Sequence, residues 1–227
     1  MESNNNKLVV FDFCETLVSF QTADAFVDFI IAKEAYHKFK WINTLKGILV
    51  KLRILAILSK LFPDLNPSKR LKLFQIRGIN SNKLLKYAQD FSKEMLTPNL
   101  IDVLYKRMLS HQSQNDIVII ISGGYSPYIK VFAEQHGIKY FFATEIELSK
   151  NKVTGHFSGK DCLNQQKVEL LEQFLQDNPI QFSSSIAYSD SSSDLPLLKW
   201  VNEGYVVSKD SSQKWAFENK LKEIIYN

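Results

Sequence analysis

Residues 8–13 of this chain read LVVFDF, and residues 117–124 read IVIIISGG. Each stretch contains a short apolar run rich in β-branched or aromatic residues, which is typical of a strand buried on both faces. The first run reaches Asp12, and the second reaches Ser122 and Gly123. Buried strands of this kind that alternate with helices form parallel sheets covered on both sides. The two stretches therefore predict an α/β protein with a doubly wound parallel sheet.

Further strand and helix patterns follow along the chain. We expect strands at 139–142, 184–188 and 204–207, a hairpin-like pair around 149–151, and helices at about 99–111, up to 136, at 165–175, from 192, and from 212 as the closing element. A long helical pattern from residue 17 to about residue 87 interrupts the alternation after the first strand. We therefore predict a core of residues 1–17 and 98–227, with residues 18–97 inserted as an α-helical cap.

The composition excludes several classes of protein. Of 227 residues, 45% are hydrophobic and 23% charged, which is ordinary for a globular chain and excludes wholesale disorder. Two cysteines, Cys14 and Cys162, exclude a disulfide framework and indicate a reducing compartment. The first six residues form no apolar signal core, and no run of 18 apolar residues is free of charge. We expect a cytoplasmic protein without a membrane span.

Polar residues gather where the predicted strands end. Asp12 follows the first strand, Ser122 and Gly123 follow the second, and Asp190 and Asp194 follow the strand at 184–188. Ligands of doubly wound sheets bind outside these carboxyl ends. Each residue alone has a structural explanation as a turn, a helix cap or a solvated side chain, and their common location is what indicates a site.

Together with Lys167, near the start of the helix at 165–175, these residues suit phosphoryl transfer. A carboxylate such as Asp12 can attack phosphorus and divide one difficult displacement into two steps. Mg²⁺ held by Asp12 and Asp190 would allow this carboxylate to approach a phosphate. Ser122, the Gly123 backbone and Lys167 can bind the phosphate oxygens.

The motifs around these residues resemble the haloacid dehalogenase superfamily, subclass IB, the phosphoserine-phosphatase-like group. The similarity lies in VVFDFCETL (9–17), IIISGG (119–124), GKDCLNQQKVELL (159–171) and IAYSDSSSDLPLL (186–198), in the family's order. The resemblance covers about residues 7–20 and 98–208. It implies a Rossmann-like core, an Mg²⁺-dependent phosphomonoester phosphatase and a phosphorylated Asp12.

The resemblance also implies a division of roles. Mg²⁺ would be bound by Asp12, the backbone carbonyl of Cys14 and Asp190, and Asp194 would be a further ligand or would orient Asp190 or a metal-bound water. Ser122, Gly123 and Lys167 would bind the phosphoryl group. Gln21 and Asp24, shortly after the first motif, are candidates for contacting the substrate at the mouth of the pocket.

Two positions depart from the family pattern. Cys14 stands where the family has its acid/base aspartate, and Glu15 stands where a glycine usually follows. A thiol is a weak hydrogen-bond donor, and loss of a positioned acid costs about 10²–10⁴-fold in rate. The substrate then has a good leaving group, or Cys14, Glu15 or a substrate group replaces the acid, or the chain is a catalytically weak or inactive binding or membrane-associated module. A phosphotransferase is a further alternative.

The net charge of +4 is unevenly distributed. Residues 33–77 contain 11 basic and two acidic residues, a local charge of +9, so the remainder carries −5. Residues 38–62 are basic and amphipathic. We interpret them first as a packed cap helix or helix pair with solvated lysines. Peripheral contact with anionic lipid and binding of an anionic substrate are the alternatives. We expect a small phosphorylated substrate as partner and no nucleic acid, because no nucleic-acid-binding motif accompanies the charge.

Overall fold

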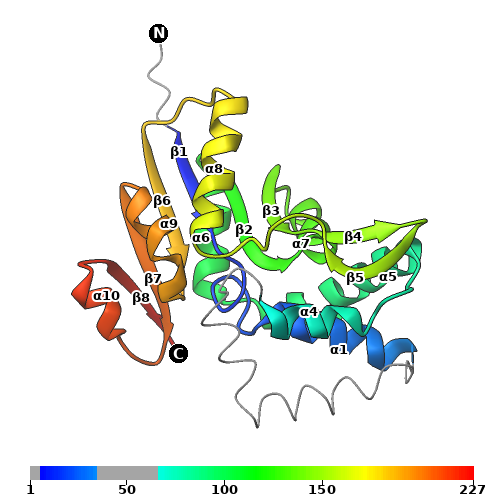
Figure 1. The fold of residues 1–227 in the computed structure, drawn as a ribbon. Helices are drawn as coiled ribbons and strands as arrows, with labels where there is room; N and C mark the ends of the chain where they lie inside the picture. The colour runs from blue at the N-terminus through cyan, green and yellow to red at the C-terminus, as the bar shows by residue number, and fades with distance from the viewer. Residues whose placement is uncertain (1–5, 35–65) are drawn as a thin grey trace.

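The computed structural model describes residues 6–34 and 66–227 (Figure 1). Its main sheet has six parallel strands in the order β3-β2-β1-β6-β7-β8. The strands are β1 (Lys7–Phe11), β2 (Ile117–Tyr125), β3 (Tyr140–Thr144), β6 (Ser184–Ser189), β7 (Glu203–Lys209) and β8 (Lys222–Tyr226). A separate antiparallel pair joins β4 (Ile146–Ser149) and β5 (Lys152–Phe157). The predicted doubly wound α/β fold is confirmed.

Helices connect the strands. They are α1 (Thr22–Glu34), α4 (Pro67–Phe74), α5 (Ser81–Phe91), α6 (Asp102–Ser113), α7 (Ser126–Gln135), α8 (Gln165–Asp177), α9 (Leu195–Trp200) and α10 (Lys214–Glu218). Short turns of π-helix (Ser92–Leu96) and 3₁₀-helix (Thr97–Asn99, Ser192–Asp194) complete the described elements. Between β1 and α6, α1 packs against α4 and α5, and α4 packs against β5 (Figure 1).

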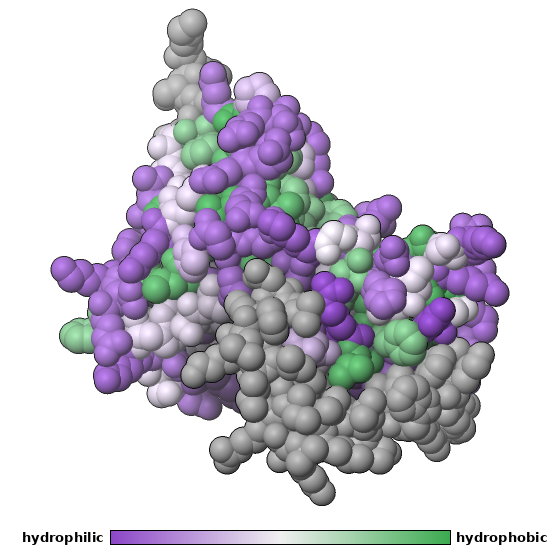
Figure 2. Space-filling view, in the orientation of Figure 1, coloured by the Kyte–Doolittle hydropathy of each residue, from purple (hydrophilic) through white to green (hydrophobic). Residues whose placement is uncertain are grey.

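Two hydrophobic clusters lie on opposite faces of the sheet, because successive side chains of a strand point to opposite sides. Val9 and Phe11 of β1 belong to the cluster that also contains residues of α1, α5, α6 and α7. Leu8 and Val10 belong to the cluster beneath α8, α9 and α10. The side of α8 turned toward the viewer in Figure 2 is largely hydrophilic, whereas Val168 and Leu171 are buried against the sheet. Burial on both faces explains the uninterrupted apolar runs of the central strands.

The chain end differs from the sequence prediction. The helix expected from residue 212 is wrong in its extent, since α10 spans only Lys214–Glu218. Lys220 has a positive φ of 56°, and the next residues form the edge strand β8, paired in parallel with β7. Ile224 of this strand is buried in the core. A five-residue strand leaves too little of an alternating pattern to be distinguished from the end of a helix.

Candidate active site

A cavity of about 220 Å³ opens at the carboxyl ends of the central strands. Strands β1 and β6 are neighbours in the sheet, and the strand order runs outward from them in both directions, so they form the topological switch point where such folds bind ligands. Seven of the predicted site residues line the cavity: Asp12, Cys14, Gln21, Gly123, Lys167, Asp190 and Asp194.

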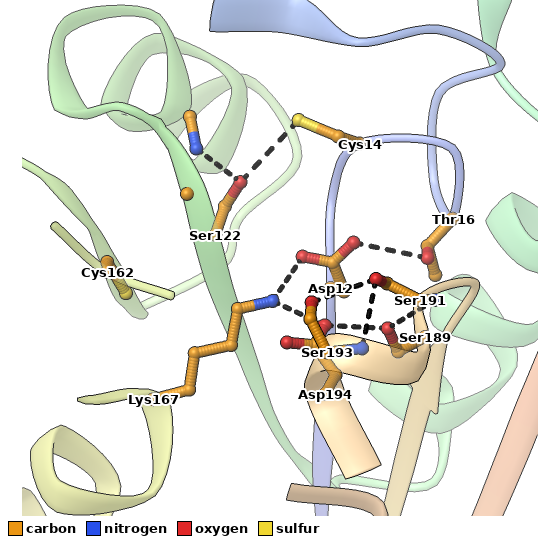
Figure 3. Close-up of polar contacts among 12 residues, drawn as sticks. Asp12, Cys14, Thr16, Ser122, Cys162, Lys167, Ser189, Ser191, Ser193 and Asp194 are labelled. Carbon is orange, nitrogen blue, oxygen red and sulfur yellow. Dashed lines mark hydrogen bonds and ion pairs between the residues drawn. The ribbon is translucent and has the colours of Figure 1, made fainter. Parts of the chain in front are cut away.

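Lys167 lies between two carboxylates at the centre of the site (Figure 3). Its ammonium donates to Asp12 Oδ1 at 2.7 Å and to Asp194 Oδ2 at 2.6 Å. The lysine is 2% exposed, and Asp12 is 5% exposed. Burial disfavours the charge on Lys167, but the two carboxylates outweigh this effect and raise its pKa. The ammonium therefore stays charged beside the oxygen predicted to attack phosphorus.

Thr16 links Asp12 to Asp190. Its hydroxyl lies 3.3 Å from Asp12 Oδ2 and 3.1 Å from Asp190 Oδ1, and its oxygen accepts the Asp190 backbone N–H at 3.0 Å. Burial, followed by repulsion from Asp12 and Glu15, raises the pKa of Asp190 to about 8. Burial also raises the pKa of Asp12, against the opposing effect of Lys167. The buried Asp12 and the partly buried Asp190 thus share one hydroxyl, and no cation of the described residues is seen to pair with Asp190.

The chemistry of this donor set fits Mg²⁺. The ion is usually held by one or two carboxylates, with waters and substrate phosphate completing its coordination. Asp194 Oδ1 is buried and finds no hydrogen-bond partner among the described residues, so it could accept from an additional donor such as a metal-bound water. Among residues 6–34 and 66–227, His, Cys, Asp and Glu side chains form no group of three that could hold a metal ion. A site here would therefore rely on two carboxylates, a backbone carbonyl and water.

The Ser122–Gly124 turn lies beside this carboxylate group. Ser122 is fully buried, and its Oγ accepts the Gly124 N–H at 2.9 Å. A Cβ on Gly123 would lie 2.3 Å from Leu163 Cδ2, and one on Gly124 would lie 2.5 Å from the Tyr128 hydroxyl oxygen. The fully buried Tyr128 hydroxyl therefore leaves no room for a side chain at Gly124, whereas at Gly123 the close contact is with the tip of the partly buried Leu163 side chain.

Cys14 replaces a carboxylate with a thiol in the cavity. Its Sγ lies 2.9 Å from Thr22 Oγ1 and 3.9 Å from Ser122 Oγ, and Thr22 Oγ1 lies 2.7 Å from the Tyr128 hydroxyl. Burial and the charge of Asp12 raise the thiol pKa, so Cys14 stays protonated at neutral pH. Cys162, by contrast, is 1% exposed in the hydrophobic core, and burial raises its pKa to about 12.

The remaining candidates lie nearer the rim. Gln21 lines the cavity and donates to Glu15 Oε2. Asp24 is exposed in the first turn of α1 and is not among the lining residues. The basic amphipathic stretch 38–62 lies outside the described residues. Within the part of the chain that is described, none of the helices is long and apolar enough to cross a membrane.

Three residues of the site were not singled out from the sequence. Thr16 is hydrogen-bonded to Asp12 and Asp190, Asn66 lines the cavity, and Lys69 reaches it from α4. Lys69 belongs to the basic segment 33–77, where nothing distinguished a buried lysine from a solvated one. Thr16 follows Asp12 by four residues, and this proximity was the only available signal.

Comparison with known proteins decides the family. The model of the haloacid dehalogenase-like hydrolase family matches residues 9–199, which include every cavity residue of β1, β2, α8 and the loop after β6. This chain belongs to the haloacid dehalogenase-like hydrolase family.

Individual members of the family are more distant. A histidinol-phosphatase of Neisseria meningitidis serogroup C is 26% identical over 152 residues, which are 65% of this chain and 68% of the relative. A phosphoserine phosphatase of Methanocaldococcus jannaschii is 24% identical over 193 residues, covering 85% and 81% of the two chains. A crystal structure of a Bordetella pertussis Tohama I protein of unknown function has a TM-score of 0.78 at 19% identity, covering 97% and 98%. The fold of this chain is thus similar to that of the Bordetella pertussis protein over nearly the whole length of both.

Proposed function

We propose that this haloacid dehalogenase-like hydrolase is an Mg²⁺-dependent phosphatase that cleaves a small phosphate monoester through an aspartyl-phosphate intermediate. The observation that carries the proposal is the placement of the Lys167 ammonium, which touches Asp12 and Asp194 at the switch point of the sheet. A cation at this position neutralises both the attacking carboxylate and an incoming phosphoryl group.

In the first step, an Asp12 carboxylate oxygen attacks phosphorus, the P–O bond to the leaving group breaks, and the leaving oxygen takes up a proton. Lys167 holds Asp12 in place through its 2.7 Å hydrogen bond and faces the transferring oxygens. In the second step, water attacks the phosphorus of aspartyl phosphate, which releases inorganic phosphate and restores Asp12. Ser122 supplies a hydroxyl donor for the phosphoryl oxygens.

Asp12, Asp190 and the Cys14 carbonyl are the residues that would hold Mg²⁺, with Asp194 beside them. When bound, the ion offsets the repulsion between these carboxylates and the phosphate. The raised pKa of Asp190 supports this role, because Asp190 has no cationic partner among the contacts of the described residues that would favour its ionised form.

The test of this function is phosphate release from p-nitrophenyl phosphate and from a panel of phosphate monoesters, with Mg²⁺ and with a chelator in excess. We expect release with Mg²⁺ and its loss with the chelator. Absence of release from every ester would contradict the phosphatase assignment, and appearance of phosphate on a second alcohol would identify a phosphotransferase.

Mg²⁺ is expected to raise the thermal unfolding midpoint of the wild-type chain. At 100 times its dissociation constant, a ligand that binds only the folded state adds about 2.7 kcal/mol. In Asp190→Asn this increase should be much smaller, because one ligand has lost its charge. Differential scanning calorimetry with and without Mg²⁺ measures both values, and equal increases in the two proteins would exclude Asp190 as a ligand.

Cys14→Asp is expected to increase kcat/KM for esters with poor, alkyl leaving groups. The thiol stays protonated but is a weak donor, so a carboxylic acid at the same position protonates an alkoxide more effectively. We expect a gain of about tenfold or more for alkyl phosphates and little change for p-nitrophenyl phosphate. No gain with alkyl esters would indicate that another group already donates the proton.

The substrate that we propose is a small phosphorylated metabolite. The similarity to a histidinol-phosphatase and to phosphoserine phosphatases supports a small phosphorylated metabolite, in agreement with a cavity of about 220 Å³. We further propose that residues 18–97 act as a cap over the core of residues 1–17 and 98–227. Contact of residues 38–62 with a membrane and a cytoplasmic location remain predictions.

A further inference from the structure

Helix α4 carries a buried lysine that the proposed chemistry does not use. Lys69 is 8% exposed, and its ammonium makes three hydrogen bonds. The acceptors are the Gly123 carbonyl at 2.5 Å, Asp161 Oδ1 at 2.5 Å and Thr144 Oγ1 at 3.0 Å. An ammonium has three protons, so these bonds use its full donor capacity. Lys69 lines the cavity but has no proton left for a substrate.

The Gly123 carbonyl belongs to the peptide unit between Gly123 and Gly124, which is hydrogen-bonded to the Ser122 side chain. The oxygen of this unit accepts from Lys69, and its N–H, on Gly124, donates to Ser122 Oγ at 2.9 Å. The Thr144 hydroxyl is 3.2 Å from the same carbonyl, but its closer acceptor is Asp161 Oδ1 at 2.6 Å. Lys69 is therefore the principal donor that holds one end of the peptide, and Ser122 holds the other.

This arrangement leaves the Ser122 proton available. Ser122 Oγ already accepts a backbone N–H, and among the described residues the one contact seen for its own proton is with Cys14 Sγ at 3.9 Å, which is long and weak. Hydrogen bonds in a chain polarise one another in a buried site. A charged donor on the Gly123 carbonyl makes the Gly124 N–H a stronger donor, and this in turn strengthens Ser122 as a donor toward a phosphate oxygen.

Asp161 keeps Lys69 at this position. It accepts from Lys69, from Thr144 and from Asn66 Nδ2 at 3.0 Å, so the start of α4 is joined to the loop that leads into α8 and Lys167. Burial lowers the pKa of Lys69, and Asp161 opposes this effect. The ammonium also lies 5.1 Å from the ring centroids of Tyr125 and Phe157.

We propose that Lys69 is a positioning residue that orients the Ser122–Gly124 turn for phosphate through the Gly123 carbonyl. The inference rests on the proposed function, since it assigns Lys69 a role only if Ser122 binds phosphate. This role differs from that of a cap lysine that binds the substrate directly, because Lys69 acts through a peptide group and does not contact the ester.

A double-mutant cycle tests this coupling. We expect Lys69→Met to lower kcat/KM for p-nitrophenyl phosphate, and the affinity for inorganic phosphate measured by calorimetry with Mg²⁺, by about tenfold. In a Ser122→Ala background the same change should cost less than about twofold, because the group through which Lys69 acts is already absent. Equal losses in the two backgrounds, or no loss in either, would overturn the proposal.

Two further variants separate positioning from stability. Lys72→Met is a matched control: Lys72 lies three residues further along α4, is 7% exposed and pairs with Asp28, away from the cavity. It should leave kcat/KM unchanged. Lys69→Met leaves Asp161 without its ammonium. The double variant Lys69→Met/Asp161→Asn, which also removes this carboxylate charge, is therefore measured as well. Its loss of kcat/KM should again be smaller in the Ser122→Ala background than in the wild-type background.

The outcomes also separate this inference from the proposed function. If the wild-type chain neither hydrolyses esters nor binds inorganic phosphate, the proposed function fails. If it does both and Lys69→Met is additive with Ser122→Ala, only the role of Lys69 fails.

Discussion

Asp12→Asn is expected to abolish phosphate release while the chain remains folded. The substitution keeps the shape and volume of the side chain but removes the carboxylate that we propose attacks phosphorus. Loss of a nucleophile lowers turnover by about 10⁴-fold or more. Lys167 keeps Asp194 as a partner at 2.6 Å, and the repulsion between residues 12 and 190 disappears, so the fold retains its main contacts. Steady-state rates with saturating Mg²⁺ measure the effect.

Asp116→Asn is the matched control for this substitution. Asp116 is a buried carboxylate whose side chain is 3% exposed and pairs with His111, and it precedes β2 at the end of the sheet opposite the cavity. We expect Asp116→Asn to retain turnover even if it lowers the unfolding midpoint. Full activity in Asp12→Asn would contradict the proposed mechanism, and equal loss in both variants would attribute the effect to folding.

Lys167→Met is expected to lower both turnover and stability. Removing one preorganised donor from the developing charge costs about 10²–10³-fold in kcat. The same change leaves two buried carboxylates without their cation, and breaking a buried pair in this way costs about 3–5 kcal/mol. Steady-state kinetics and urea unfolding measure the two losses separately. Lys160→Met provides the control, because the Lys160 side chain is 75% exposed and, within the described part of the chain, pairs only with Glu169 at 3.3 Å.

The stability loss of Lys167→Met should depend on pH in a defined direction. Burial already raises the pKa of Asp12, and Lys167 opposes that rise. Without the ammonium the pKa of Asp12 rises further. At pH values above 3.8, the ordinary pKa of an aspartate, the folded state then binds more protons than the unfolded state. Stability then falls as pH rises. Urea unfolding at pH 5 and pH 8 should show the larger deficit at pH 8.

Much of this architecture was predictable because the central strands are buried on both faces. Uninterrupted runs such as 8–11 and 117–121 occur where helices cover both sides of a sheet, so the pattern in the sequence reports the environment directly. The same logic placed Asp12, Lys167, Asp190 and Asp194 near one another. Their common side of the sheet follows from parallel strands, and the cavity brings them together.

The rest depended on contacts between distant residues. Lys69 bonds to Gly123 and Asp161, which lie 54 and 92 positions away along the chain. No local pattern distinguishes such a lysine from the ten other basic residues of segment 33–77. Strand β8 was missed for a related reason, since its pairing with β7 provides the hydrogen bonds that a short isolated stretch lacks.

The pairing of β1 with β6 has a consequence for the order in which the chain becomes functional. Val9 lies opposite Ile186 in this pair, and Thr16 meets Asp190 across a separation of 174 residues. Asp12 is therefore synthesised long before its partner strand, and the proposed phosphate site cannot be complete on the ribosome until β6 emerges. Contacts of such long range slow folding. Enzymatic activity in this protein would thus appear late in synthesis, and its appearance would indicate that both halves of the sheet have paired.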